Sequence, residues 1–178
     1  MLVLVIYGTV EGHTGKIAGK VASQIEAAGH QVNLTDVRQP GFAVPGQFDA
    51  AIVCAPIHLG EYPAPVVQFL HDYAAALNQI PSALITVSLS IASLFEAEVK
   101  QANAYPEHLV SKTGWLPTMR HNAAGALKYL EYSYFKRLLM RHIAAKEGGP
   151  VNTTADHELT DWDSLQAFVG AFADRYLR

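Results

Sequence analysis

The sequence has little cysteine: Cys54 is the only one among 178 residues, so no disulfide can form within the chain. Secreted folds that depend on disulfides are therefore excluded, and a reducing compartment such as the cytoplasm is expected. The chain also lacks an apolar run of about 18 residues, the length that a membrane-spanning helix needs. Its apolar first residues have no basic segment before them and run directly into Gly8, which favours a buried strand over a signal peptide.

The chain has little net charge, −3 at pH 7, which gives no reason to expect nucleic-acid binding. Half of the residues are hydrophobic and 16% are charged, a composition typical of a compact globular protein rather than a disordered one. The charge is unevenly spread. Residues 128–147 contain five lysines and arginines against two glutamates, so an otherwise acidic chain has one basic segment. The length fits a single domain, residues 1–178.

Short apolar runs alternate with helical patterns along the chain, which implies βαβ units and a mostly parallel sheet. Five expected strands suit the order 2-1-3-4-5, so the predicted fold class is an α/β, flavodoxin-like three-layer sandwich. Residues 128–158 are too many for a simple connection and are predicted to form an insert before the last helix. The expected strands are 2–7, 31–36, 48–54, 83–89 and 118–127, and the expected helices are 14–28, 63–77, one from about 93 and one from about 160.

Three signals bear on the ends of the last two helices. Ser93 with Glu96 has the spacing of a capping box, which predicts that Ser93 caps the third helix. Thr160 with Asp163 has the same spacing and predicts a cap by Thr160 for the last helix. Pro106 is expected to end or kink the third helix, because proline has no N–H and clashes with the preceding turn.

The segment after the first strand, residues 8–16, is predicted to bind a phosphate. It is not a Walker A loop, because Ile17 follows Lys16 where a magnesium site needs Ser or Thr, and a dinucleotide-binding G-x-G-x-x-G is also absent. Backbone N–H groups at a helix start can instead enclose a phosphate together with threonine hydroxyls. The residues assigned to this loop are Thr9, Val10, Glu11, Gly12, His13 and Thr14. The alternative is that Thr14 only starts the helix and Gly12 only turns the chain.

Two more loops follow strands at the same predicted edge, where such sheets bind their ligands. The loop after the third strand offers Tyr62, whose ring can stack on an isoalloxazine, and Gly60, which permits close backbone approach. The loop after the fourth strand can present backbone groups to the pyrimidine edge of the ring. Together the three loops predict FMN as the cofactor. The residues assigned are Pro56, Ile57, His58, Leu59, Gly60 and Tyr62 in the first of these loops and Ser88, Leu89, Ser90 and Ile91 in the second.

Simpler interpretations of these residues stay open. Tyr62 is alternatively a half-buried side chain at a helix start, His58 alternatively faces solvent, and Ser93 is alternatively only a helix cap. Cys54, at a strand end within an apolar run, is predicted to be inert core. No residue is assigned to catalysis or to a metal.

The rest of the chain resembles a known family. The features that carry the resemblance are Ser82-Ala83, Trp115, Ala124-Gly125-Ala126-Leu127, the aromatic and basic stretch 129–140, Gly148-Gly149 and Thr160-Asp161-Trp162. They are similar to the bacterial menaquinone-dependent protoporphyrinogen oxidases, a flavodoxin-domain family. The resemblance implies FMN, removal of hydrogens from protoporphyrinogen IX in haem biosynthesis, and transfer of electrons to a membrane quinone. The sequence departs from that family at His58-Leu59, where a basic residue and an aromatic are expected, and between Ser90 and Tyr105, where only Lys100 is basic.

The insert has an apolar stripe at helical spacing next to its basic residues; the stripe consists of Tyr132, Phe135, Leu138, Leu139 and Ile143. One interpretation is peripheral contact of residues 128–147 with the anionic inner face of the cytoplasmic membrane. A helix packed on the domain and a self-association face are the alternatives.

The sequence is compatible with three functions. The first is an FMN-dependent dehydrogenase linked to a quinone, with a porphyrinogen as its substrate. The second is an electron carrier without a substrate of its own, or a related FMN-dependent quinone reductase. The third is a binding module that has lost FMN, against which the two threonines of the phosphate loop argue.

Overall fold

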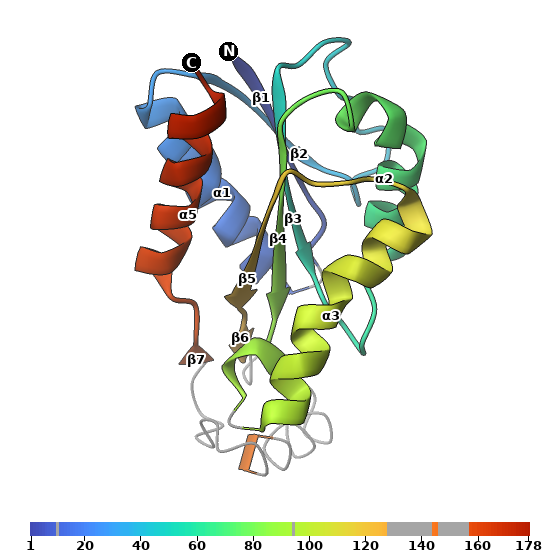
Figure 1. Cartoon of the computed structure of the whole chain (residues 1–178), viewed down its shortest axis with the longest axis vertical. Helices are drawn as coiled ribbons and strands as arrows, with labels where there is room; N and C mark the ends of the chain where they lie inside the picture. The colour runs from blue at the N-terminus through green and yellow to red at the C-terminus, as the bar shows by residue number, and fades with distance from the viewer. Residues whose placement is uncertain (10, 94, 128–143, 146–156) are drawn as a thin grey trace.

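The computed structural model describes residues 1–9, 11–93, 95–127, 144–145 and 157–178 (Figure 1). Within this part of the chain, five parallel strands form one sheet in the order β2-β1-β3-β4-β5, which confirms the predicted fold class. The strands are β1 (Leu2–Tyr7), β2 (Gln31–Asp36), β3 (Ala50–Pro56), β4 (Ser82–Ser88) and β5 (Met119–Ala124).

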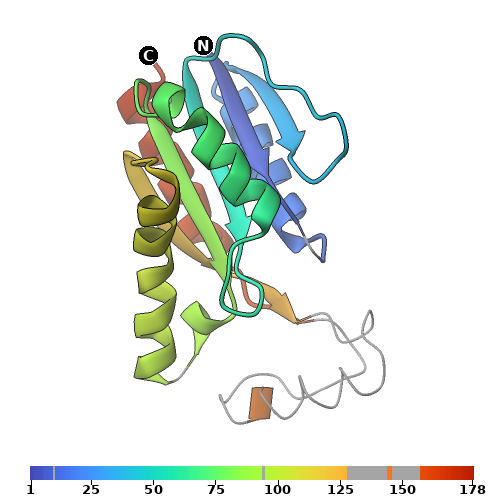
Figure 2. The same cartoon turned by 90° about the vertical axis from the view of Figure 1, so that its right-hand side faces the viewer.

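Helices cover both faces of the sheet (Figures 1 and 2). Val3 and Val5 of β1 pack into the core on one face, and Leu4 and Ile6 pack into the core on the other. This burial on two sides explains why β1, β3 and β4 read as continuous apolar runs. The helices on the first face are α1 (His13–Ala27) and α5 (Trp162–Tyr176), and those on the second are α2 (Ala64–Leu77) and α3 (Glu96–Thr113).

The last predicted strand, residues 118–127, is divided at Gly125. Beyond β5, the short strand β6 (Ala126–Leu127) pairs in antiparallel fashion with β7 (His157–Glu158). Residues 127 and 157 are therefore adjacent in space, near the carboxyl end of β5. Of the residues between them, only 144 and 145 are described, so the apolar stripe and the bases predicted for membrane contact lie outside the described residues.

The prediction that Pro106 ends the third helix is wrong, and a kink at Pro106 stays a prediction. Helix α3 continues through Pro106 and ends at Gly114, which has a φ of 72°. The helix buries Tyr105, Pro106 and Leu109 against the rest of the domain. This burial offsets the roughly 3 kcal/mol that proline costs inside a helix.

Both predicted capping residues are also wrong. The residue before α3 is Phe95, and the Ser93 hydroxyl accepts a hydrogen bond from its N–H at 3.0 Å, a local turn that competes with capping. Helix α5 is capped by Asp161, whose Oδ1 accepts from the N–H of Ser164 at 2.9 Å. Thr160 does not cap, because its hydroxyl makes other hydrogen bonds.

Within the described ranges, no helix is long and apolar enough to cross a membrane. In the same ranges, no group of three or more His, Cys, Asp or Glu side chains is placed to hold a metal ion. Cys54 is completely buried, and this burial raises the pKa of its thiol to about 12. The cysteine is therefore part of the core, as predicted.

Candidate functional site

The three loops singled out from the sequence lie at one edge of the sheet. β1, β3 and β4 are parallel neighbours, so the loops that follow them start at the same carboxyl edge, the end of the arrowheads in Figure 1. Ligands of such sheets bind at this edge, beside the strand where the order of connections reverses. In this protein that strand is β1.

The loop between β1 and α1 has the features of an anion site. Gly12 adopts a left-handed conformation with a φ of 88°, and its N–H donates to Oγ1 of Thr9 at 2.8 Å. Arg38 donates from its guanidinium to the carbonyl oxygen of Thr9. Helix α1 begins without a side-chain cap and has no acidic residue in its first turn. The N–H groups and the dipole of this helix start therefore favour a bound anion.

Hydroxyl groups at the same edge have unused hydrogen-bonding capacity. Thr14 is only 3% exposed, and its hydroxyl has no partner among the described residues. Ser88, at the end of β4, has a buried Oγ that likewise finds no partner in the described part of the chain. A buried polar group without a partner costs about 1–3 kcal/mol. The Ser88 hydroxyl therefore fits a site that is completed by a polar ligand such as a flavin ring. The Thr14 hydroxyl, at the start of α1, can donate to a phosphate there.

The loop after β3 is a tight turn that exposes an apolar side chain. The N–H of His58 donates to the carbonyl of Glu61 at 2.9 Å, and the N–H of Glu61 donates back at 3.1 Å. Leu59 and Gly60 between them have φ values of 51° and 84°, as in a type I′ turn. Leucine rarely adopts this conformation, and strain of this kind often marks a ligand site. The Leu59 side chain is 92% exposed, so it presents an apolar surface at this edge of the sheet.

Tyr62 lies in a different place from the one predicted. Its side chain is 8% exposed and packs in the core beneath α2 and α3. Its hydroxyl is 2.8 Å from Oγ1 of Thr86, and burial raises the pKa of Tyr62. Because almost no ring surface remains exposed, this placement does not support stacking of Tyr62 on a flavin. It favours the alternative, a tyrosine packed at a helix start.

The loop after β4 forms a short 3-10 turn, η1 (Ser90–Ala92). The carbonyl of Leu89 accepts from the N–H of Ala92 at 3.1 Å, and the carbonyl of Ser88 accepts from Gly125 at 3.2 Å. Burial raises the pKa of Tyr105, which packs beneath this loop. These contacts hold the loop in one conformation at the carboxyl edge. Contact of Ser90 or Ile91 with the pyrimidine edge of a flavin stays a prediction.

A cluster of side chains beside the phosphate loop could not be predicted from the sequence. His13 was assigned to the loop, but Nε2 of its buried ring lies 2.7 Å from the Thr160 hydroxyl. Nζ of Lys16 and Nε1 of Trp162 both donate to Glu158, at 2.5 and 2.6 Å. The closeness of Thr160 and Trp162 to the phosphate loop depends on contacts between distant parts of the chain. No local spacing in the sequence indicates it.

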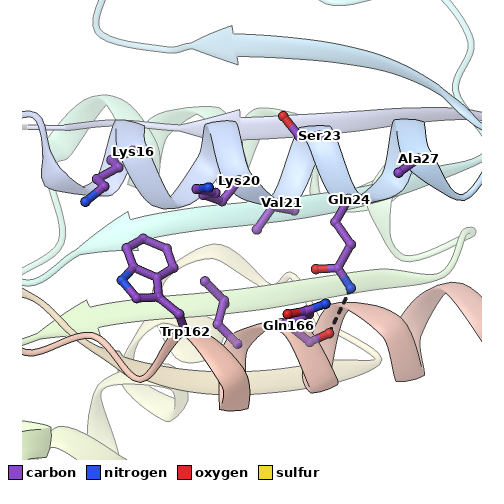
Figure 3. A pocket seen from close by; sticks show the side chains of 9 residues that line it. Lys16, Lys20, Val21, Ser23, Gln24, Ala27, Trp162 and Gln166 are labelled. Atoms are coloured by element: carbon purple, nitrogen blue, oxygen red, sulfur yellow. Dashed lines mark hydrogen bonds between the residues drawn. The ribbon is translucent and has the colours of Figure 1, made fainter.

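A groove of about 620 Å³ runs between α1 and α5 (Figure 3). Lys16 of α1 and Trp162 of α5 point toward one another at one end, and Gln24 donates to the carbonyl of Gln166 farther along. The groove is lined by helix residues and contains no residue of the three loops. It is therefore separate from the candidate cofactor site.

Comparisons with known proteins agree with this arrangement. The flavodoxin domain family matches residues 4–154. The chain is 28% identical over 173 residues to the protoporphyrinogen IX dehydrogenase [quinone] of Escherichia coli strain K12, which covers 97% of this chain and 95% of that protein. It is 26% identical over 171 residues to the protein of the same name from Leishmania major, with 96% and 74% covered. Among solved structures, the flavodoxin of Streptococcus pneumonia TIGR4 superposes with a TM-score of 0.58 at 16% identity, over 98% of this chain and 99% of that one.

Proposed function

Because this chain belongs to the flavodoxin domain family, we propose that it binds FMN and acts as a quinone-linked dehydrogenase of protoporphyrinogen IX. The observation that carries the proposal is the extent of the similarity. The Escherichia coli dehydrogenase is matched over 95% of its length, so the likeness extends beyond the flavin loops to the β6–β7 pair and the segment between them.

In this proposal, different residues at the carboxyl edge contact the phosphate and the ring of FMN. The first turn of α1 and the hydroxyls of Thr9 and Thr14 hold the phosphate of FMN. Thr9 accepts from Gly12, so its own proton is left to donate outward. Leu59 and Ser88 contact the ring from the two other loops. When bound, FMN supplies the redox chemistry, taking up hydrogens from an organic donor and passing electrons to an acceptor. The protein binds and orients it.

The β6–β7 pair favours an enzyme over an electron carrier. It brings both ends of the segment 128–156 to the carboxyl edge of the sheet, where the phosphate loop also lies. Residues 128–147 have the most basic composition in an otherwise acidic chain. A basic segment suits the propionate groups of a porphyrinogen or an anionic lipid surface. A flavodoxin that docks to cationic redox partners needs acidic residues around its flavin instead.

The place of the protein in the cell follows from the same proposal. A quinone acceptor dissolved in the cytoplasmic membrane requires the protein to reach the lipid surface from the cytoplasm. We propose peripheral contact through residues 128–147, which is supported by their sequence pattern of apolar and basic residues.

Mixing the FMN-loaded protein with protoporphyrinogen IX without oxygen tests the enzyme directly. The expected result is rapid bleaching of the yellow flavin as it is reduced, followed by return of the colour when a menaquinone analogue is added. An electron carrier would be bleached by a reduced protein partner or by dithionite but not by the porphyrinogen. Absence of bleaching by the porphyrinogen, with normal bleaching by dithionite, would refute the proposed substrate.

A further inference from the structure

His13 is a buried histidine to which the proposed function gives no role. It is the first residue of α1 and directly precedes Thr14, and only 9% of it is exposed. Its Nε2 lies 2.7 Å from Oγ1 of Thr160, and the same oxygen lies 2.7 Å from the carbonyl oxygen of Ala124. The start of α1 is therefore connected through one hydroxyl to the end of β5.

The hydrogen-bond chain has a definite direction. A threonine hydroxyl has one proton, and only a donor can face the carbonyl of Ala124, so Thr160 gives its proton to that carbonyl. Its oxygen must then accept from His13, which places a proton on Nε2 of the ring. On the other side of the ring, Nδ1 of His13 lies 3.8 Å from Oε2 of Glu158, within ion-pair distance. The contact between Nε2 and Thr160 is thus a directional hydrogen bond from the helix start.

The acceptor is held firmly by its own neighbours. Leu159, just before Thr160, donates its N–H to the carbonyl of Gly125 at 3.1 Å. Glu158 accepts from Lys16 and Trp162, and the hydrogen bond from Lys16 is the main reason why the pKa of Glu158 is lowered. Nζ of Lys16 also lies over the Trp162 ring, 5.1 Å from the ring centroid. The two side chains point toward each other from α1 and α5 (Figure 3). His13 is therefore bonded to a segment that is itself hydrogen-bonded to the end of β5 and to α1.

We propose that His13 is a positioning residue for the phosphate loop: its bond to Thr160 sets the orientation of the first turn of α1, and with it the direction of the Thr14 hydroxyl. Thr14 has no side-chain partner of its own in the described part of the chain, so its direction depends on the backbone of that turn. Binding groups must be held within roughly 0.5 Å of the productive geometry, which requires such support. This inference rests on the proposed binding of FMN by its phosphate.

A matched pair of variants tests the bond. In His13→Gln the side-chain amide nitrogen can reach the position that Nε2 occupies in histidine. The shorter side chain of His13→Asn carries its amide only to the position of Nδ1. Because one net hydrogen bond is worth about 1 kcal/mol, His13→Asn should weaken FMN binding about 5- to 10-fold, while His13→Gln stays within about 3-fold of the parent. Riboflavin, which lacks the phosphate, should bind all three proteins about equally. Flavin fluorescence titrations measure both affinities.

Thr160 provides a second pair that does not alter α1. Thr160→Ser keeps the hydroxyl and should bind FMN like the parent, whereas Thr160→Val should show the loss seen for His13→Asn. The double variant His13→Asn/Thr160→Val should lose no more than either single variant, because all three remove the same bond. Thermal unfolding of each variant confirms that the protein compared is folded.

The possible outcomes separate the two proposals. Suppose that the parent binds FMN more tightly than riboflavin, and that His13→Asn and Thr160→Val show the same ratio of the two affinities. The positioning role of His13 is then overturned, while the proposed binding of FMN by its phosphate is retained. Equal losses of FMN and riboflavin in these variants would also overturn it, since they indicate a purely structural role. If the parent itself binds FMN and riboflavin equally, phosphate recognition fails, and the role of His13 fails with it.

Discussion

Thr14→Ala is expected to weaken FMN binding about 10- to 100-fold, because one charge-assisted hydrogen bond to a phosphate is worth about 1.5–3 kcal/mol. Thr14 lies in the first turn of α1, is 3% exposed and has a hydroxyl without a partner among the described residues. The substitution removes that hydroxyl from a helix that starts without a side-chain cap. The dissociation constant of FMN, measured by fluorescence quenching on apoprotein, reports the effect.

Thr14→Ser is the matched control, because it keeps the hydroxyl and removes only a methyl group. Its FMN affinity should stay within about 3-fold of the parent, since a side-chain methyl makes only a small contribution to phosphate binding. If Thr14→Ala and Thr14→Ser bind FMN equally well, the hydroxyl does not contact the phosphate. The loop would then bind through its backbone alone, or not at all.

Trp115→Ala is expected to lower the free energy of unfolding by about 3–5 kcal/mol, the usual cost of removing a large aromatic side chain from a core. Trp115 is completely buried, and its Nε1 donates to Oγ of Ser82 at 3.0 Å. It precedes β5, and Ser82 begins β4, so this contact lies at the amino edge of the sheet, opposite the flavin loops. Chemical denaturation followed by circular dichroism measures the loss.

Trp115→Phe keeps most of the apolar volume and should cost about 1–3 kcal/mol, because it leaves the Ser82 hydroxyl buried without a donor. Neither variant should change the absorption spectrum or the affinity of flavin bound to the folded protein. The position of Trp115 at the amino edge excludes it as a residue that stacks on a flavin held at the carboxyl edge. A shifted flavin spectrum in Trp115→Phe would contradict this placement of the cofactor.

The order of the sheet could be predicted from the sequence because its signals are local. The central strands β1, β3 and β4 are buried on both faces and therefore read as apolar runs, as Val3 to Ile6 illustrate in β1. The end of α1 was also predictable, because Gly29 has a φ of 90° and only glycine adopts this conformation without strain. Once the strand order is known, the edge that binds ligands follows from topology.

The orientation of individual side chains could not be predicted in the same way. Tyr62 is next to the loop that was assigned to the flavin, yet its ring turns into the core to reach Thr86, 24 residues away. Thr160 has the spacing of a capping residue, but its hydroxyl meets His13, 147 residues away in sequence. In both cases a tertiary contact outweighs a local preference. Such contacts depend on packing that a single sequence does not reveal.

We propose that the loop at the start of α1 recognises the phosphate of FMN. Titration of the unmodified apoprotein with FMN and with riboflavin isolates this recognition, because the two flavins share the ring and differ in the phosphate. FMN is expected to bind at least about 100-fold more tightly than riboflavin, a difference of about 2.7 kcal/mol. Equal affinity for the two flavins would mean that the loop does not recognise the phosphate.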